Sequence, residues 1–273
     1  MTPSERDAGE PAFTLQRGDA PLLVSMPHVG TGLPPAVAEA LAPPARALAD
    51  TDWHLPRLYD FLRALDATVL VATQSRYLID LNRPPDGSSL YPGMTTTDLV
   101  PHETFRGEPL WRDGPPADDE VAARRARWWQ PYHDTLRDEL ARLRARHARV
   151  VLWDAHSIAS VLPRFFEGRL PDLNFGTADG AACDPALIDA VLAPVRAQAR
   201  YSWVLNGRYK GGHITRSHGR PAQGVHAVQL EMAQAIYMDE DPPFAFDEAR
   251  SAQLRPLLGD CLRGALAWSR ERS

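Results

Sequence analysis

The sequence predicts an α/β fold in which helices pack in layers on a β-sheet. Short apolar runs bounded by turn residues recur along the chain, amphipathic helical patterns lie between them, and no stretch resembles an interdomain linker. Strand and helix patterns that alternate along one chain are typical of layered α/β proteins. A chain of 273 residues, 44% of them hydrophobic, can bury a large core without disulfide bonds. We therefore expect one domain over residues 1–273, with residues 1–12 as a flexible tail.

Six short apolar runs predict buried strands, because each is bounded by residues that favour turns. In chain order these runs are residues 21–26, 68–72, 77–81, 150–153, 202–205 and 225–230. Proline is frequent, with 25 residues, and its pairs fall between the periodic segments. These proline pairs indicate loops.

Three longer segments show apolar residues at helical spacing. They are residues 118–147, 184–198 and 247–269. Asp184 and Asp247 stand at the starts of the second and third segments, where an aspartate side chain can cap a helix. Pro131 should kink the first helix or mark the start of one. The basic residues between 124 and 149 alternate with acidic and apolar ones, which is typical of a solvated helix face.

Composition excludes several classes of function. The formal net charge of −5 and the pI near 6.0 argue against nucleic-acid binding, which needs a basic face. The two cysteines, Cys183 and Cys261, can form neither a disulfide framework nor a thiolate zinc site. The polar N-terminus and the absence of a long apolar run predict a cytoplasmic protein with no membrane partner.

Two histidines follow predicted strands, and catalytic groups in open α/β sheets lie just past the carboxyl ends of strands. His28 follows the strand at residues 21–26, and His156 follows the strand at residues 150–153. Each imidazole can bind a divalent metal, although His28 can equally be an ordinary loop histidine. Asp154 is close enough to orient His156, or it can bond a neighbouring loop.

Carboxylates elsewhere can complete such a site. Asp50 and Asp52 precede an apolar-periodic stretch, where they can either cap a helix or supply a third metal ligand. Two histidines, one carboxylate and an open position for water form the ligand set of hydrolytic zinc sites. Glu231 ends an apolar run, where a buried carboxylate can act as general base, and the alternative is an exposed glutamate on an edge strand.

Several cations can recognise an anionic substrate. Arg76 and Arg83 flank a predicted strand, and arginine suits both carboxylate binding and stabilisation of an oxyanion. Lys210 and Arg216 flank a paired glycine, which lets backbone approach a ligand. No Gly-x-Ser-x-Gly motif is present, which disfavours a serine hydrolase.

Taken together, these segments resemble the N-formylglutamate amidohydrolase family. The matching stretches are residues 27–30, 50–59, 75–84, 154–157, 210–216 and 224–232, and the resemblance covers nearly the whole chain. The family is similar to zinc carboxypeptidases and aspartoacylases, which implies a mixed central sheet flanked by helices. It also implies hydrolysis of N-formyl-L-glutamate in histidine degradation. Two alternatives stay open: a metallohydrolase of another N-acyl amino acid or of a C-terminal peptide bond, and a non-catalytic protein that binds acidic amino acids on the same fold. We expect a monomer or a small homo-oligomer.

The resemblance further implies a role for each candidate residue. His28 and His156 bind one divalent metal ion, with zinc as the expected metal. The relatives' tight His-x-x-Glu spacing is absent, so the acidic ligand is carried over to Asp52, with Asp50 as the fallback. Glu231 matches the catalytic glutamate, and Arg76 the arginine that stabilises the oxyanion.

The remaining candidates bind the small acidic substrate. Asn82 and Arg83 match a pair that binds the substrate carboxylate in those relatives. We expect Arg216, with Lys210 beside it on the glycine-rich loop, to bind the second carboxylate.

Overall fold

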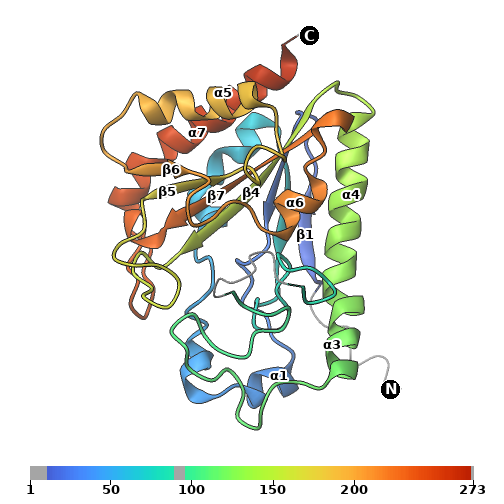
Figure 1. Ribbon diagram of the computed structural model, residues 1–273, viewed down its shortest axis with the longest axis vertical. Coiled ribbons are helices and arrows are strands. Elements are labelled where there is room, and N and C mark those ends of the chain that lie inside the picture. Colours follow the sequence, from blue (N-terminus) through green and yellow to red (C-terminus); the bar gives the residue numbers. More distant parts are fainter. Residues whose placement is uncertain (1–10, 89–95, 272–273) are drawn as a thin grey trace.

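A seven-stranded mixed β-sheet runs through the part of the chain that the structure describes, residues 11–88 and 96–271 (Figure 1). In this computed structural model the strand order is β1-β3-β2-β4-β7-β5-β6. The central strands β3, β2, β4 and β7 are parallel, whereas β1 pairs antiparallel with β3, and β5 with β7. The strands are β1 (Phe13–Gln16), β2 (Leu22–Met26), β3 (Thr68–Ala72), β4 (Val150–Ile158), β5 (Leu173–Gly176), β6 (Trp203–Leu205) and β7 (Val225–Ala233). The predicted mixed α/β sheet is confirmed.

Helices flank this sheet on both faces. The α-helices are α1 (Pro35–Ala40), α2 (Leu55–Leu58), α3 (Asp118–Arg124), α4 (Gln130–Arg144), α5 (Pro185–Arg196), α6 (His213–His218) and α7 (Glu248–Arg270). Short 3-10 segments are η2 (Pro43–Ala47), η3 (Asp60–Leu65), η5 (Pro221–Gln223) and η6 (Gln234–Ile236), and η4 (Arg125–Trp129) is a π-helical segment. In Figure 1, α5 and α7 lie together on one side of the sheet and α4 lies on the other.

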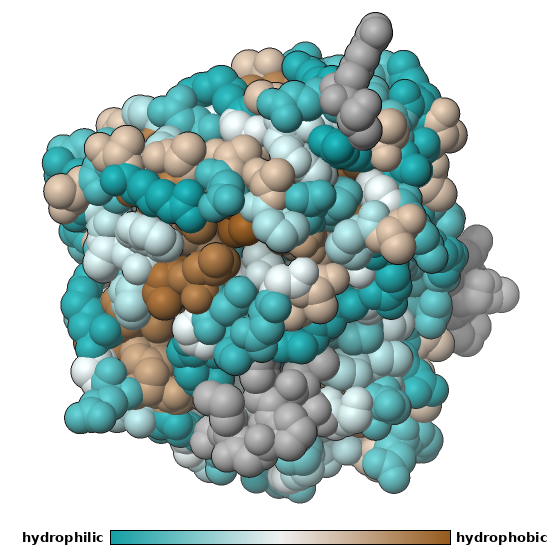
Figure 2. Space-filling model, turned by 45° about the horizontal axis from the view of Figure 1, so that its top comes forward, coloured by the Kyte–Doolittle hydropathy of each residue, from teal (hydrophilic) through white to brown (hydrophobic). Residues whose placement is uncertain are grey.

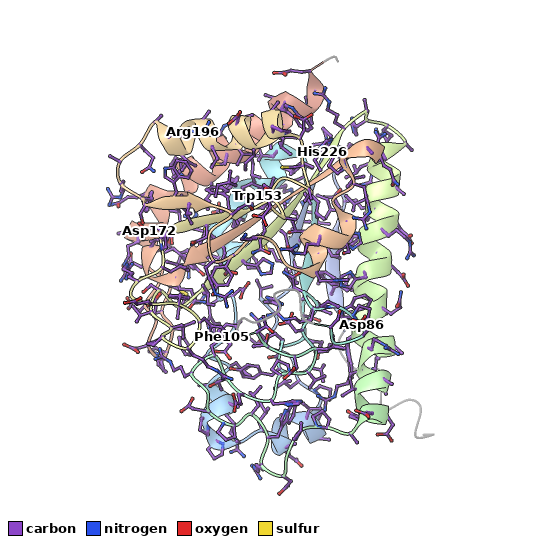
Figure 3. All side chains as sticks on the ribbon, in the orientation of Figure 1. Asp86, Phe105, Trp153, Asp172, Arg196 and His226 are labelled. Atoms are coloured by element: carbon purple, nitrogen blue, oxygen red, sulfur yellow. The ribbon has the colours of Figure 1, made fainter. Side chains whose placement is uncertain are left out.

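The alternation of side chains along each strand divides the core into two parts. Val151 and Trp153 of β4 pack in the cluster that contains α5 and α7, and Figure 3 shows Trp153 on the sheet. Val150 and Leu152 pack in the second cluster, with α4 and α6. Figure 3 places Phe105 among the loops beyond the strand ends, away from both helical layers.

The predicted helices are confirmed with small shifts of their ends. Asp184 caps α5 by accepting a hydrogen bond from Ala186 N, and Asp247 caps α7 by accepting one from Arg250 N. The segment predicted at residues 118–147 forms α3, η4 and α4 in succession, and Pro131 lies in the first turn of α4. The π-helical segment η4 lies directly before this proline, and Gln130 N donates to Arg125 O, five residues back, so the helix is locally widened where proline cannot donate.

The strand predicted at residues 77–81 is wrong. These residues are buried in the second core cluster, but their backbone forms turns. Ser75 sets the turn, because its carbonyl oxygen accepts from Leu78 N and its hydroxyl from Tyr77 N. The apolar run therefore correctly indicated that these residues are buried, but it did not indicate a strand conformation correctly. Strands β1 and β5 were not predicted, because each has only four residues, half of them polar or glycine.

Other expectations concern the surface and the termini. Cys183 and Cys261 are buried and free, in agreement with the absence of a disulfide framework. Within residues 11–88 and 96–271, no helix has the length and apolar character needed to cross a membrane. Figure 2 shows a face that is mostly hydrophilic, with hydrophobic residues gathered in one recessed area. The predicted tail falls mainly on residues 1–10, which lie outside the described residues, and Ala12 O accepts a hydrogen bond from Thr73 N.

Candidate active site

The candidate site lies where β2, β4 and β7 end at one edge of the sheet. His28 follows β2, His156 lies in the second half of β4, and Glu231 lies in the second half of β7. In the parallel pairing of β4 with β7, His156 stands opposite Glu231. Because residues opposite one another on neighbouring strands share a face of the sheet, this register brings an imidazole and a carboxylate together.

A cluster of two histidines and one aspartate forms the centre of the site. His28, Asp52 and His156 are buried and offer ligand atoms within 4.8 Å of one another. Asp52 Oδ2 lies 3.0 Å from Nδ1 of His156 and 3.8 Å from Nδ1 of His28. Asp52 N donates a 3.0 Å hydrogen bond to the carbonyl oxygen of His28, which fixes the loop beside the histidine. The structure thus brings together the three residues proposed from the sequence as metal ligands.

The opposite nitrogen of each imidazole ring is held by other polar groups. Nε2 of His28 lies 2.7 Å from Oδ1 of Asp80. Nε2 of His156 lies 3.1 Å from Oδ1 of Asp154 and 2.9 Å from Nδ2 of Asn82. A metal-binding histidine commonly bonds a carboxylate through its second nitrogen, which fixes the orientation of the ring. Asp80 is placed to do this for His28, whereas at His156 the hydrogen-bond contact is with Asn82 and Asp154 contributes a nearby negative charge.

Asp80 is a site residue that the sequence analysis did not single out. It lies inside the apolar run at residues 77–81, and a carboxylate buried in such a run is costly unless it is paired. Its Oδ2 accepts a 2.6 Å hydrogen bond from Nη2 of Arg76. Burial alone would raise the pKa of Asp80, but His28 and Arg76 outweigh burial and hold this pKa well below its usual range. An unexplained acidic residue in an apolar run was the available signal.

The two histidines have different electrostatic settings. Burial, followed by the charge of Arg76, lowers the pKa of His28 against the opposing effect of two carboxylates. For His156 burial also lowers the pKa, but Asp154 and Asp52 outweigh it and raise the pKa well above its usual value. Only the neutral imidazole binds a metal, so a cation at this cluster would compete with a proton on His156.

The cluster fits a divalent metal ion. Asp52 Oδ1 is one of the buried side-chain oxygens, among the described residues, that lack a hydrogen-bond partner. Two ring nitrogens and a carboxylate oxygen are a donor set that zinc accepts, and they leave a position for water. Asp50, the fallback ligand, is engaged elsewhere, because its Oδ2 accepts a 2.8 Å hydrogen bond from Phe105 N. Neither aspartate caps α2, whose N-cap residue is His54 and has no capping side chain.

Glu231 is buried at 8% exposure and lines the same pocket as His28 and His156. It lies on β7, between β4 and β5, so it is not the exposed edge-strand glutamate that the sequence left open. Burial raises its pKa to about 8, with His156 opposing this rise and Asp52 adding to it. A carboxyl group with a pKa near neutrality can both accept and donate a proton.

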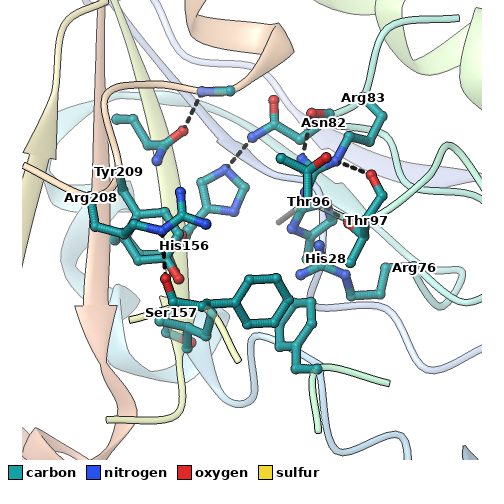
Figure 4. A pocket seen from close by; sticks show the side chains of 16 residues that line it. His28, Arg76, Asn82, Arg83, Thr96, Thr97, His156, Ser157, Arg208 and Tyr209 are labelled. Atoms are coloured by element: carbon teal, nitrogen blue, oxygen red, sulfur yellow. Dashed lines mark hydrogen bonds between the residues drawn. The ribbon is translucent and has the colours of Figure 1, made fainter. Parts of the chain in front are cut away.

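The pocket has about 610 Å³ of empty space, including its open mouth (Figure 4). Arg76 and Arg83 both line it, as predicted. The guanidinium carbon of Arg76 lies 4.7 Å from the centroid of the Phe105 ring, and Nη1 lies 3.7 Å from Oδ1 of Asp52. Nε of Arg83 donates a 2.9 Å hydrogen bond to Thr97 O. Both arginines are therefore oriented by the protein before a substrate arrives.

Asn82 also lines the pocket, but its side-chain amide bonds protein groups. Its Oδ1 accepts from Ile214 N at 2.8 Å, and its Nδ2 lies 2.9 Å from Nε2 of His156 and 3.3 Å from Oδ2 of Asp154. These contacts join the loop after β3, strand β4 and helix α6. The amide is therefore arranged to hold His156 and α6, in contrast to the expected contact with a substrate carboxylate.

Lys210 and Arg216 are not among the residues that line this pocket, and their binding of the substrate stays a prediction. Nε of Arg216 donates to Gly211 O at 2.9 Å, and Nζ of Lys210 lies 3.1 Å from Asp179 on an exposed surface. Arg208 and Tyr209, from the same loop, line the pocket instead (Figure 4). The sequence located the loop, but it could not show which of the loop's cations points inward.

Known proteins resemble this chain over nearly its whole length. N-formylglutamate deformylases from Pseudomonas aeruginosa and Pseudomonas putida are 53% and 49% identical to it, and each comparison covers 95% of this chain and 98% or 97% of the relative. The crystal structure of N-formylglutamate amidohydrolase from Ralstonia eutropha JMP134 matches with a TM-score of 0.81 and 27% identity, covering 95% of this chain and 98% of that one. A gene product of Agrobacterium tumefaciens shares the fold, with a TM-score of 0.75 and 20% identity over 96% of this chain and 97% of its own.

The family model of N-formylglutamate amidohydrolase matches residues 20–238. This range contains His28, Asp52, His156 and Glu231, together with both pocket arginines from the loop after β3. The family comparison therefore confirms the resemblance that was noted from the sequence. The chain belongs to the N-formylglutamate amidohydrolase family.

Proposed function

We propose that the chain is a metal-dependent hydrolase that converts N-formyl-L-glutamate and water to formate and L-glutamate. The observation that carries the proposal is the buried His28–Asp52–His156 cluster, which shares one pocket with Glu231. The Pseudomonas relatives support this substrate, because they are named N-formylglutamate deformylases and about half of their residues are identical to those of this chain. The arginines of the pocket suit a substrate that carries two carboxylates.

His28, Asp52 and His156 would hold one divalent ion through two ring nitrogens and a carboxylate oxygen, and zinc is the metal that this donor set favours. Such an ion, when bound, polarises a carbonyl oxygen and lowers the pKa of water to roughly 7. Asp80 and Asn82 hold the far sides of the His28 and His156 rings, so that both Nδ1 atoms stay turned toward Asp52.

Glu231 moves the proton in this proposal. Its carboxylate accepts a proton from the attacking water, whose oxygen forms a bond to the formyl carbon. Glu231 then delivers that proton to the glutamate nitrogen as the carbon–nitrogen bond breaks. Burial raises the pKa of Glu231, which strengthens the carboxylate as a proton acceptor.

Arg76 and Arg83 take different parts of the substrate. Arg76 is buried beside Asp52 and is held by Asp80, so its guanidinium is placed to stabilise the formyl oxygen as that oxygen becomes negative. Arg83 lies on the same side of the pocket, and we assign it to the α-carboxylate. Asn82 orients His156 and α6, as its hydrogen bonds indicate.

Formate release coupled to elemental analysis tests the proposal. We expect purified protein to contain one divalent ion per chain and to release formate from N-formyl-L-glutamate. Chelation should remove both the ion and the activity, and added zinc should restore both. Full activity in protein that holds no divalent ion would contradict the proposed metal dependence. Turnover of N-acetylaspartate but not of N-formyl-L-glutamate would contradict the proposed substrate.

We also propose that the protein is cytoplasmic and takes part in histidine degradation. Deletion of the coding sequence from its source bacterium tests this part. Cells grown on histidine as nitrogen source should then accumulate N-formylglutamate, and unchanged growth without accumulation would contradict the role.

A further inference from the structure

The pocket has a second polar wall that the proposed chemistry does not use. Arg208 and Tyr209 follow β6 and line the pocket. Figure 4 shows them on one side and Arg76 and Arg83 on the other, with His28 and His156 between the two sides. The centre of the pocket therefore has cationic side chains on both flanks.

The hydroxyl group of Tyr209 points to a missing ligand. It is buried and is among the described side-chain polar atoms that have no hydrogen-bond partner. A buried hydroxyl without a partner is unfavourable, and it becomes favourable when a bound molecule supplies the partner. Burial, together with the nearby Glu231, raises the pKa of Tyr209 above its ordinary value, so the phenol remains a hydrogen-bond donor.

Arg208 is held in place for recognition beside this hydroxyl. Its Nε donates a 2.9 Å hydrogen bond to the carbonyl oxygen of Phe165, whose ring also lines the pocket. The Arg208 guanidinium carbon lies 5.4 Å from the centroid of the Tyr209 ring. The planar guanidinium of arginine suits recognition of a carboxylate.

We infer that Arg208 and Tyr209 bind the side-chain carboxylate of the substrate and so determine the preference for an acidic N-formyl amino acid. This inference rests on the proposed function and completes its account of the substrate. With the formyl group at the cluster of His28, Asp52 and His156, and the α-carboxylate at Arg83, the side chain of the substrate extends toward the opposite wall.

Three substrates separate the two carboxylates. N-formylglutamate has both, N-formylnorvaline has only the α-carboxylate, and 4-formamidobutanoate has only the side-chain carboxylate. For Arg208→Met, we expect kcat/KM to fall by about 10²-fold for the first and third substrates, mainly through KM, with little change for N-formylnorvaline. Tyr209→Phe should show the same selectivity with a smaller fall of about 10-fold.

A matched pair of control variants exists in the same chain. Arg200 and Tyr201 form the same dipeptide, with the guanidinium carbon of Arg200 5.8 Å from the centroid of the Tyr201 ring, but neither residue lines the pocket. Arg200→Met and Tyr201→Phe should leave all three substrates unaffected. Arg216→Met tests the rival cation, which lies on α6. If Arg216→Met abolished the preference and Arg208→Met did not, the inference would be wrong.

Binding of the reaction product provides a readout that does not need turnover. Calorimetry should show that the zinc-loaded wild-type protein binds L-glutamate more tightly than L-norvaline, and that Arg208→Met loses this difference. Binding without formate release would support the inference and contradict the proposed function. If the wild-type protein released formate and Arg208→Met lowered kcat/KM equally for all three substrates, the proposed function would be supported and the inference contradicted.

Discussion

Glu231 and His156 face each other across the β4–β7 pair, and only His156 belongs to the cluster of predicted ligands. The Glu231→Gln variant keeps the shape of the side chain and removes its ability to accept a proton. We expect turnover to fall by about 10²–10⁴-fold, because proton transfer is lost. The metal content measured by elemental analysis should stay the same.

Glu248→Gln is the control for this change, because Glu248 is exposed on α7 and far from the pocket lining. It should keep full activity. Loss of metal from Glu231→Gln would instead make Glu231 a ligand, and near-normal turnover would remove it from the reaction.

Asp80 contacts both His28 and Arg76 through its two carboxylate oxygens. In Asp80→Asn, His28 loses the charged acceptor that orients its ring. Changes of this kind typically weaken metal binding by about 10–100-fold. Competition with a chelating dye measures the affinity, and Asp134→Asn, which alters an exposed ion pair with Arg137, should leave it unchanged. An Asp80→Asn protein with wild-type affinity would show that His28 needs no such support.

At the scale of secondary-structure elements, Gly212 couples the start of α6 to the loop after β3. A Cβ atom at this position would lie 2.4 Å from Nδ2 of Asn82, closer than atoms can approach. Gly212→Ala should therefore displace Asn82 or α6, and with them the support of His156. We expect a clear loss of kcat and a lower melting temperature, measured by formate release and by calorimetry.

Gly259 supplies the control for this substitution. It lies inside α7, and an added Cβ would meet only the flexible end of Arg263, at 3.2 Å. Alanine is favoured over glycine within a helix by roughly 0.5–1 kcal/mol, so Gly259→Ala should be neutral or slightly stabilising. Equal behaviour of the two variants would mean that the Gly212–Asn82 contact has no functional role.

The ends of strands were the most predictable part of the site. His28, His156 and Glu231 could be found from the sequence because each stands in or just after an apolar run, and parallel strands bring such positions to one edge. Asp52 was placed through family resemblance, and its hydrogen bond to the carbonyl of His28 is a loop contact that no periodic pattern encodes.

Loops were predicted less well, for a physical reason. Residues 77–81 have the composition of a strand, yet local bonds from Ser75 turn the backbone. Likewise, Arg208 lies in the loop after β6 and Arg216 in the short helix α6 that follows, and the sequence has no signal for which one faces inward. Side-chain direction in a loop depends on contacts made after folding, such as the bond from Arg208 to Phe165.

For the whole molecule, the metal proposed at His28, Asp52 and His156 would couple metal binding to stability. A metal that binds only the folded protein stabilises it by about 2.7 kcal/mol at 100 times its dissociation constant. In proteins slightly smaller than this one, a change of about 1 kcal/mol in the free energy of unfolding shifts the melting temperature by roughly 2–4 °C. We therefore expect added zinc to raise the melting temperature of chelated protein by about 5 °C or more.

The stabilisation should require the cluster itself. Asp52→Asn replaces an anionic ligand by a neutral one, so the zinc-dependent shift should become much smaller. Scanning calorimetry of both proteins with and without zinc measures the difference. A shift of the same size in Asp52→Asn would locate the responsible metal site elsewhere on the protein.

The division of the pocket between two parts of the sheet has a consequence for evolution. The hydrolytic groups belong to β2, β4, β7 and the loops next to them, whereas Arg208 and Tyr209 belong to the segment that follows the edge strand β6. Mutations near this edge could alter the accepted side chain while the reaction centre persists. A few substitutions could thus change which acyl amino acids such enzymes accept, while the groups that carry out the reaction stay the same.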